Sequence, residues 1–588
     1  MSFPSTRPAA APTIAAAAPP AGTLAATVLL RTLFDHGVEY FFCNPGTDFP
    51  AIVEAYSLAE AAGEIGVRVP TPVVVPHENA AVSMAHGAYL ASGKPQAVMV
   101  HVSVGTANTV NGAANAGRDQ APILIMAGRS PITEAGMHGS RNRPIHWAQE
   151  MYDQGGMLRE FVKWDFELRM ASETAATVAR AMEVMMTSPR GPGYLSLPRE
   201  VLSLPVAADR AVVAPKSVAA APWPHPEAIE TLAAWIAAAE RPLVVASASG
   251  RTRAGFLALA DLAERFALPV VTLAGRYACL PHSHPMHFGY QVKPLLEDAD
   301  LVVVLDCDVP WLPSLESPPA DCRVVHVAAD PAFARYPTRG FPSHLSITAD
   351  PVPALAALGR ALEAGGTHDS PLVARRRSAL MTRRAAMRSA WKAQGDAAAA
   401  DREHIRPEFI SRCISEAVGD DAVIVNEYPL RLEHCPRNRP DTFYGLSPAG
   451  GLGWGLGSAI GMKRLRPDAT VVVTLGDGAY MFDNPTACHW VSAVQKLPVL
   501  VVVFNNQLYG AVRNSTASMY VDGASAANGC TLLADLSPSP AFEMIAQANG
   551  AYGERVEDPA ELQGALQRAL HAVQVEGRQA LLNVVCRY

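Results

Sequence analysis

Apolar runs of strand length alternate with longer stretches of helix-forming residues in the first third of the chain. Each run is apolar throughout, as expected for parallel strands that are covered on both faces. The runs read VEYFFC, TPVVVP, QAVMVHV, APILIMA and GYLSLP. This pattern predicts a parallel sheet with helices packed on both sides.

The same alternation returns twice further along the chain. The runs are RPLVVASA, LPVVTLAG, ADLVVVLDC and CRVVHVAAD, then DAVIVNE, ATVVVTLGDG, LPVLVVVFNN and QALLNVVCRY. Because 588 residues exceed what one hydrophobic core serves, we predict an α/β chain with three doubly wound parallel-sheet domains. The predicted segments are a disordered tail (1–22), an N-terminal domain (23–205), a central domain (223–365), a linker helix (366–403) and a C-terminal domain (404–588).

Composition and charge argue against nucleic acid and membranes as partners. Hydrophobic residues make up 49% of the chain and charged residues 18%, and the net charge of −7 offers no general attraction for nucleic acid or acidic membranes. No apolar stretch reaches the roughly 18 uncharged residues of a transmembrane helix. The arginine-rich stretch 370–401 favours a solvated connecting helix over a helix that binds nucleic acid or membrane. We therefore expect a small-molecule substrate.

Cysteine usage and the N-terminus bear on the compartment. The nine cysteines contain no C-x-x-C pair and are odd in number, which argues against a disulfide framework or a structural zinc. The first 22 residues lack the basic start and continuous apolar stretch of a secretory signal. We expect a cytoplasmic protein.

Two apolar runs of the C-terminal domain end in polar motifs. One ends in Gly476-Asp477-Gly478, and after twenty-six further residues the next ends in Asn505-Asn506. Since parallel strands present their carboxyl ends at one edge of a sheet, Asp477 and Asn506 should converge there. Carboxylate and amide oxygens suit Mg²⁺, and a helix that begins at Pro485 would favour phosphate beside it. GDG alone would equally fit a tight strand-to-helix turn, but the spaced NN favours a binding site.

The spaced GDG and NN motifs resemble the cofactor signature of the thiamine diphosphate-dependent 2-oxo acid decarboxylase and acetohydroxyacid synthase superfamily. The resemblance implies that Asp477 and Asn506 are magnesium ligands, with Leu508 contributing its main-chain carbonyl. It also implies a set of residues that bind thiamine diphosphate around the first motif and the NN pair: Gly476, Asp477, Gly478, Ala479 and Asn506.

Two further segments match this superfamily. The stretch VVVPHENAAVSMAHGAYL places Glu78 where the family has a glutamate that contacts the aminopyrimidine ring and promotes loss of the thiazolium C2 proton. The stretch GLSPAGGLGWGLGSAIGMK implies a carbonyl near Gly450 facing the 4′-amino group and Leu452 bending the cofactor. No strand leads into these glycines, so a dinucleotide fingerprint is disfavoured, and tight helix packing accounts for Gly457 and Gly461. Bound FAD is not supported.

The N-terminal domain most resembles the benzoylformate decarboxylases, through FFCNPGTDFP and HVSVGTANTVNGAANAGRDQ. This likeness implies that the hydroxyl of Thr47 binds a substrate carboxylate and that His101 relays a proton. The sequence departs from those decarboxylases in two places. LDCDVPWLPSLESP lacks their second active-site histidine, and the cofactor segment at FDNPTACHW is about two residues longer.

The resemblance implies an enzyme in which the C2 carbanion of thiamine diphosphate adds to a 2-oxo acid, CO2 leaves, and an aldehyde is released or captured by a second carbonyl. An acetolactate synthase-like carboligase and a 2-hydroxyacyl-CoA lyase remain open, as do a non-catalytic cofactor-binding subunit and a nicotinamide or flavin oxidoreductase. In this family Glu78 and Asp477 would come from different subunits, so we expect a homodimer as the smallest active unit and a homotetramer as its usual assembly.

Overall fold

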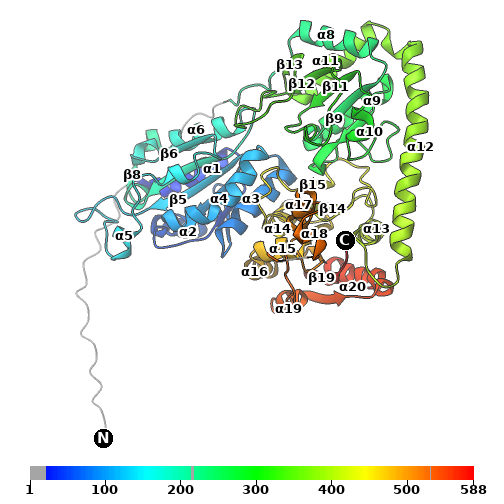
Figure 1. The fold of residues 1–588 in the computed structure, drawn as a ribbon. Helices are drawn as coiled ribbons and strands as arrows, with labels where there is room; N and C mark the ends of the chain where they lie inside the picture. The colour runs from blue at the N-terminus through cyan, green and yellow to red at the C-terminus, as the bar shows by residue number, and fades with distance from the viewer. Residues whose placement is uncertain (1–21, 213–216, 530–531) are drawn as a thin grey trace.

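The computed structural model describes residues 22–212, 217–529 and 532–588. The predicted tail over 1–22 therefore lies outside the described residues, apart from Gly22. Three separate parallel sheets, each flanked by helices, form an N-terminal, a central and a C-terminal body (Figure 1). The predicted fold class is confirmed.

The N-terminal sheet has six parallel strands in the order β3-β2-β4-β5-β7-β6. Its strands are β2 (Tyr40–Cys43), β3 (Thr71–Val74), β4 (Gln96–Val100), β5 (Ile123–Arg129), β6 (Trp164–Glu167) and β7 (Gly193–Pro198). A small antiparallel pair, β1 (Thr23–Leu24) and β8 (Pro205–Val206), ties the start of the domain to its end. The helices are α1 (Ala25–Asp35), α2 (Pro50–Ala61), α3 (Glu78–Ser92), α4 (Val102–Arg118), α5 (Ile145–Ala148), α6 (Thr174–Met186) and α7 (Arg199–Leu202).

The central sheet has five parallel strands in the order β10-β9-β11-β12-β13. They are β9 (Pro242–Ala246), β10 (Val270–Thr272), β11 (Leu301–Leu305), β12 (Arg323–Ala328) and β13 (Leu345–Thr348). The helices are α8 (Pro226–Ala238), α9 (Arg253–Phe266), α10 (Lys293–Leu296) and α11 (Pro351–Ala364).

The C-terminal sheet has six parallel strands in the order β15-β14-β16-β17-β19-β18. They are β14 (Val423–Glu427), β15 (Phe443–Gly445), β16 (Val471–Gly476), β17 (Leu500–Asn505), β18 (Tyr552–Val556) and β19 (Ala580–Val585). The helices are α13 (Pro407–Val418), α14 (Gly455–Leu465), α15 (Asp477–Phe482), α16 (Pro485–Gln495), α17 (Gly510–Met519), α18 (Ala524–Ala527), α19 (Phe542–Gln547) and α20 (Leu562–Gln574).

Close packing of α3 on α14 joins the N-terminal and C-terminal domains. A Cβ added to Gly87 of α3 would lie 1.9 Å from the carbonyl oxygen of Ser458, and one added to Gly461 of α14 would lie 1.9 Å from that of Met84. Only glycine lets the two backbones approach so closely. The packing role predicted for Gly461 is therefore confirmed.

The connecting segment forms α12 (Pro371–Ala400), a 30-residue helix that runs alongside the central and C-terminal domains (Figure 1). Several of its arginines donate to carbonyl groups of the central domain: Arg376 to Ile236, Arg377 to Glu264, and Arg384 to Ser283. The connecting helix is present and most of its residues are exposed or half-buried, but these guanidinium groups attach one face of α12 to the domain. No helix among the described residues is both long and apolar enough to span a membrane.

A cluster of aromatic side chains and histidines lies where α12 meets the central domain. The rings of His282 and His287 lie 5.0 Å apart, and Tyr290 and Trp391 pack against them. Burial and the neighbouring Arg388 lower the pKa of His282 to about 3, and burial lowers the pKa of His287 well below its usual value. The folded state therefore keeps both rings neutral.

We predict that stability falls as the pH drops below about 6.5. The histidines become protonated in the unfolded chain at a pH at which they stay neutral in the folded protein, so acid favours unfolding. His282 alone should lower the free energy of unfolding by about 2 kcal/mol between pH 7 and 5. Denaturant titrations at both pH values will measure this loss. His282→Gln should lose less than the wild type, whereas His571→Gln, at a side chain that is 59% exposed, should match it. Equal losses in all three proteins would contradict the prediction.

Candidate active site

The ends of β16 and β17 bring the GDG and NN motifs together. Gly476, the last residue of β16, pairs with Phe504 of β17. Asp477 and Asn505 therefore stand at the same end of two neighbouring strands. Asp477 is 1% exposed, and its Oδ1 accepts the Gly478 N–H at 2.9 Å. The backbone N–H groups of Gln507 and Leu508 lie near enough to lower the pKa of this carboxylate, although they donate to Asn505 Oδ1 at 3.3 Å and Asn506 Oδ1 at 3.1 Å. The segment after the NN pair therefore lies close to Asp477, while the convergence of Asp477 with Asn506 itself stays a prediction.

The two asparagines of the NN pair have different surroundings. Asn505 is fully buried and donates to Asn583 Oδ1 at 2.9 Å, which ties β17 to β19. Asn506 is half-buried, and its Oδ1 accepts the Leu508 N–H at 3.1 Å. The Leu508 carbonyl accepts the Gly510 N–H at 2.9 Å. Asn505 thus holds the sheet, and Asn506 lies with Leu508 on the side of Asp477.

The donor set around Asp477 fits a hard cation. Burial raises the pKa of Asp477 to about 6 despite its backbone hydrogen bonds, and its Oδ2 is buried with no hydrogen-bond partner. The other two expected ligand groups, the Asn506 amide oxygen and the Leu508 carbonyl oxygen, belong to the segment that directly follows β17. Such all-oxygen sites suit Mg²⁺, which keeps water and phosphate oxygens as further ligands. The described residues contain no cluster of three or more His, Cys, Asp or Glu side chains that could hold a metal by themselves.

The small residues of the first motif leave room next to Asp477. A Cβ added to Gly476 would meet no atom within 4 Å, whereas one added to Gly478 would lie 2.6 Å from the Tyr509 ring. Ala479 is buried in the first turn of α15. The helix predicted after the motif, α16, begins at Pro485. The backbone at Gly476 is therefore open to the approach of a ligand next to Asp477.

Glu78 is the first residue of α3. Its side chain is 8% exposed, and its Oε2 accepts the Asn108 Nδ2 hydrogen at 3.0 Å. The side chain of His77 caps the helix by accepting the Asn79 N–H at 3.2 Å. A Cβ added to Gly105 would lie 3.4 Å from Glu78 Oε1. The carboxyl group therefore sits at a helix N-terminus, oriented by one amide of α4.

His101 forms a dyad with Asp48, a residue that the sequence analysis missed. His101 Nδ1 lies 2.6 Å from Asp48 Oδ1, and Asp48 Oδ2 accepts the Val102 N–H at 3.2 Å. Two glycines make room for the pair: a Cβ on Gly46 would lie 2.3 Å from the His101 ring, and one on Gly128 would lie 1.8 Å from Asp48 Oδ2. The hydrogen bond to Asp48 raises the pKa of His101. The sequence did offer one sign of this dyad, because Asp48 directly follows Thr47, a residue that was already expected at the site.

Thr47 is exposed at the same edge of the N-terminal sheet, and its carbonyl accepts from Arg199 at 3.3 Å. The segment after β5 returns to this edge, where Gln149 Nε2 lies 3.5 Å from His101 Nε2. His146 of the same segment is buried, and burial together with the Arg199 charge lowers its pKa. Thr47, His101 and Gln149 thus surround one edge of the N-terminal domain.

The loop before α14 is held by side chains of the N-terminal domain. Asn115 donates to the Gly451 carbonyl at 2.8 Å, Asn111 to the Leu452 carbonyl at 2.8 Å, and Asn79 to the Gly453 carbonyl at 2.9 Å. Gly450 has a φ of +67°, which a side chain would strain. The sequence analysis named Gly450 and Leu452 but none of these asparagines, because they come from a different domain.

Glu427 at the end of β14 anchors the same loop from inside the C-terminal domain. Its carboxyl group accepts the N–H groups of Gly453, Trp454 and Gly455 at 2.8, 3.2 and 2.6 Å. Burial raises the pKa of Glu427 to about 7, against the effect of these three hydrogen bonds. This residue too was missed, since nothing in NEYPL points to a loop 26 residues away.

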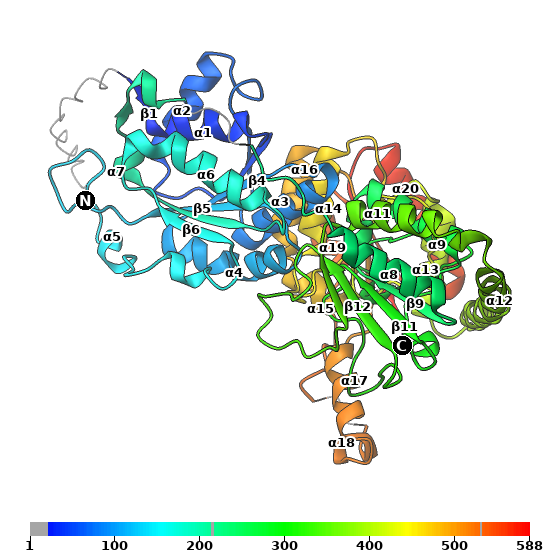
Figure 2. The same cartoon turned by 90° about the horizontal axis from the view of Figure 1, so that it is seen from above.

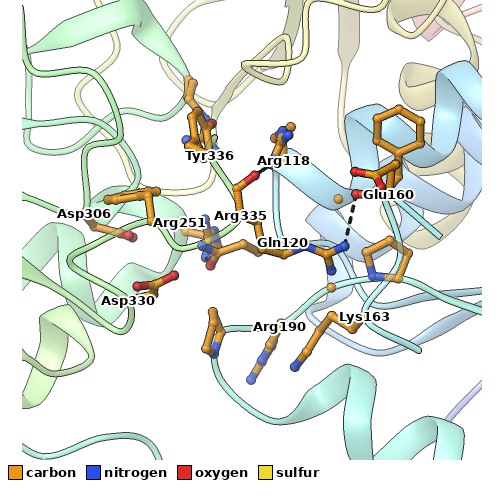
Figure 3. A pocket seen from close by; sticks show the side chains of 17 residues that line it. Arg118, Gln120, Glu160, Lys163, Arg190, Arg251, Asp306, Asp330, Arg335 and Tyr336 are labelled. Atoms are coloured by element: carbon orange, nitrogen blue, oxygen red, sulfur yellow. Dashed lines mark hydrogen bonds between the residues drawn. The ribbon is translucent and has the colours of Figure 1, made fainter. Parts of the chain in front are cut away.

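A crevice of about 200 Å³ lies apart from these groups, between the N-terminal and central domains (Figure 3). It is flanked by residues that follow the strands of the central sheet, among them Asp306 after β11 and Asp330 after β12. Arginines from both domains line it, including Arg118 and Arg335. Neither Glu78 nor Asp477 lines this crevice.

Comparison with known proteins assigns the three domains. Family models of the thiamine pyrophosphate enzymes match in order: the N-terminal binding domain at residues 24–157, the central domain at 229–358 and the C-terminal binding domain at 428–584. The chain belongs to the thiamine pyrophosphate enzyme family.

Relatives of this thiamine pyrophosphate enzyme include two differently named enzymes. A benzoylformate decarboxylase of Pseudomonas aeruginosa is 26% identical over 91% of this chain and 94% of its own length. An acetolactate synthase large subunit of Escherichia coli is 25% identical over 93% of this chain and 92% of its own length. The solved 4-hydroxybenzoylformate decarboxylase of Rhodococcus jostii shares the fold, with a TM-score of 0.77, 21% identity and coverage of 96% and 99% of the two chains.

We predict that Asp48→Asn lowers the pKa of His101. The wild-type carboxylate stabilises the protonated ring, so its removal should let His101 react with diethyl pyrocarbonate at a lower pH than in the wild type. Peptide mass spectrometry across a pH series will follow this one ring. Asp209→Asn, which changes an exposed aspartate, should leave the profile unchanged. An unshifted His101 profile in Asp48→Asn would count against the dyad.

Proposed function

We propose that this chain is a thiamine diphosphate- and Mg²⁺-dependent enzyme that breaks the bond between the carbonyl and carboxyl carbons of a 2-oxo acid. The product would be an aldehyde or, with a second carbonyl compound, a carboligated hydroxyketone. The observation that carries the proposal is the partnerless buried Oδ2 of Asp477, at the strand edge that parallel sheets use for ligands.

The C-terminal domain would hold the diphosphate through the metal. Asp477 Oδ2, the Asn506 amide oxygen and the Leu508 carbonyl would bind Mg²⁺, and the open backbone at Gly476 would admit the diphosphate oxygens. Thiamine diphosphate supplies a nucleophilic carbanion at C2 and an electron sink for the carbon that loses CO2. The protein contributes orientation and proton control.

Glu78 would hold a proton at the ring nitrogen of the aminopyrimidine. A carboxyl group in this place would favour the imino form of the 4′-amino group and so help to remove the proton at C2. The carbonyl of Gly450 would accept from the same amino group, and Leu452 would support the bend between the rings. Asn108 orients the Glu78 carboxyl group for this task.

His101 and Thr47 would act on the substrate. Asp48 accepts from His101 Nδ1, which leaves Nε2 as the atom that gives or takes a proton. The hydroxyl of Thr47 would donate to the substrate carboxylate. Both a decarboxylase and an acetolactate synthase stand among the relatives, so both fates of the product agree with the family.

A second copy of the chain would complete the site, with a homodimer as the active unit and a homotetramer as its expected assembly in the cytoplasm. Exposed apolar side chains lie near both halves of the site. Around His101 these are Ile145 and Trp147, exposed by 45% and 48%. Helix α17, which extends from the body of the C-terminal domain (Figure 2), ends next to Met519 and Tyr520, exposed by 71% and 58%. Such surfaces are typical of contacts between chains.

We predict turnover of at least one member of a panel of 2-oxo acids that includes pyruvate and benzoylformate, each with and without an added aldehyde. CO2 release and product analysis measure the reaction. Glu78→Gln should lower kcat by about 10²- to 10⁴-fold, because it removes a positioned proton carrier. Glu54→Gln, an exposed change on α2, should not.

Two results would overturn this assignment. Normal turnover by Glu78→Gln at saturating cofactor would remove Glu78 from the mechanism. Tight cofactor binding without any product would indicate a non-catalytic subunit, and release of a flavin or nicotinamide from the purified protein would indicate an oxidoreductase.

We also predict that Asp477→Asn weakens thiamine diphosphate binding in the presence of Mg²⁺ by about 10- to 100-fold or more, because an amide is a poorer ligand for a hard cation than a carboxylate. Isothermal titration of the cofactor-free protein provides the dissociation constant. Asp468→Asn, at an exposed turn, serves as the control. Equal affinities in Asp477→Asn and the wild type would contradict the metal assignment.

A further inference from the structure

A buried network of hydrogen bonds connects the loop before α14 to the central domain. The Trp454 indole N–H donates to His86 Nδ1 at 3.0 Å, and His86 Nε2 lies 2.8 Å from Asp119 Oδ2. Asp119 Oδ1 accepts from Arg276 at 2.5 Å and from the Tyr277 hydroxyl at 3.0 Å. These five residues, called here the buried network, belong to all three domains.

Every member of the buried network is shielded from solvent. Trp454 is 0% exposed, His86 1%, Asp119 2%, Tyr277 3% and Arg276 5%. Burial would raise the pKa of Asp119, but the Arg276 guanidinium and the His86 hydrogen bond outweigh it and hold that pKa well below its usual value. Asp119 is therefore a carboxylate whose partners are all inside the protein.

The hydrogen-bonding capacities of the side chains leave only one arrangement of protons. An indole N–H can only donate, so His86 Nδ1 must carry a lone pair. The ring proton of His86 then lies on Nε2 and points at the Asp119 carboxylate. If Asp119 were not held in place by Arg276 and Tyr277, this tautomer of His86 would lose its support.

Trp454 directly follows the loop 450–453 and precedes the first residue of α14. Its backbone N–H is held by Glu427, and its side chain is held by His86. The indole ring packs edge-on against the His86 ring, with 5.7 Å between centroids. Glu427, which holds the backbone of Trp454, belongs to the C-terminal domain. His86, which holds the indole ring, belongs to the N-terminal domain and is connected through Asp119 to Arg276 of the central domain.

We propose that His86 and Asp119 are positioning residues for the cofactor loop 450–453, and that Arg276 and Tyr277 give the central domain control over that loop. The inference rests on the proposed function, in which Gly450 and Leu452 of this loop face the aminopyrimidine. No residue of the buried network other than Trp454 needs to approach the cofactor. Arg276 also lines the interdomain crevice, so the network runs from the wall of that crevice to the loop.

If the network only joined the domains, its loss should have the same effect on the loop as the loss of any other buried hydrogen bond between domains. Tyr444 provides the matched comparison, because its hydroxyl donates to the Leu90 carbonyl of α3 at 3.2 Å. That bond also joins the C-terminal domain to α3, and no hydrogen bond among the described residues links the Tyr444 hydroxyl to residues 450–454. The Tyr444 ring does pack edge-on against Tyr277, a contact that Tyr444→Phe keeps. Loss of either bond removes one buried interdomain contact, and only loss of the Trp454 bond should release the loop.

The test compares Trp454→Phe with Tyr444→Phe by hydrogen–deuterium exchange of the cofactor-free protein. Trp454→Phe keeps an aromatic ring and removes the donor, so the amides of segment 450–457 should exchange about 5- to 10-fold faster, the factor that one buried hydrogen bond contributes. Tyr444→Phe should leave this segment as in the wild type. Tyr277→Phe, in the central domain, should accelerate the same amides by a smaller factor.

Titration with thiamine diphosphate and Mg²⁺ provides the second measurement. Trp454→Phe and Tyr277→Phe should weaken binding in proportion to the faster exchange, and Tyr444→Phe should not. Wild-type exchange in segment 450–457 of both Trp454→Phe and Tyr277→Phe, or equal acceleration in Tyr444→Phe, would overturn the proposal. Failure of the wild type itself to bind thiamine diphosphate would instead refute the proposed function, and the exchange comparison would still decide whether the network holds the loop.

Discussion

The contact of α3 with α14 is the constraint on which the site depends. Gly87 and Gly461 let the two helix backbones meet, and a methyl group at either position would overlap a main-chain carbonyl. This contact brings the start of α3, with Glu78 and Asn79, next to the loop that precedes α14. Asn79, Asn111 and Asn115 can then hold three successive carbonyls of that loop, a geometry that neither domain could create by itself.

The buried carboxyl groups of the protein have distinct roles because their partners differ. Asp119 is fully paired with internal donors, and Glu427 accepts three main-chain N–H groups, so both serve to hold structure in place. Asp48 orients a histidine whose other nitrogen remains available. Asp477 has one oxygen that is buried without a partner, as Asp483 and Glu200 also have, and it is the one of the three that directly follows a strand beside the NN pair. A cation would relieve that imbalance, which is why this position carries the functional proposal.

Family membership and the proposed chemistry rest on different observations. The three family models and relatives that align over most of the chain establish the family, while the proposed contacts with the substrate concern Thr47 and His101. Those residues lie at the edge of the N-terminal sheet, next to exposed apolar side chains. The buried network connects the central domain to Trp454, which directly follows the loop 450–453.

The sequence by itself determined the three α/β domains and the position of the GDG and NN motifs at the ends of neighbouring strands. Fully apolar runs identify central strands, and a polar motif at a strand end lies at the ligand-binding edge whatever the rest of the chain does. Of the strands that the pattern missed, β6, β13, β15 and β18 lie at edges of the three parallel sheets, where strands need not be apolar on both faces, and β1 and β8 form the short antiparallel pair. Only the tertiary structure decided the partners of His101 and of the loop 450–454, and the attachment of the α12 arginines. Asp48 lies 53 residues from His101, and His86 lies 368 residues from Trp454, so these contacts depend on how whole domains pack and not on any local pattern.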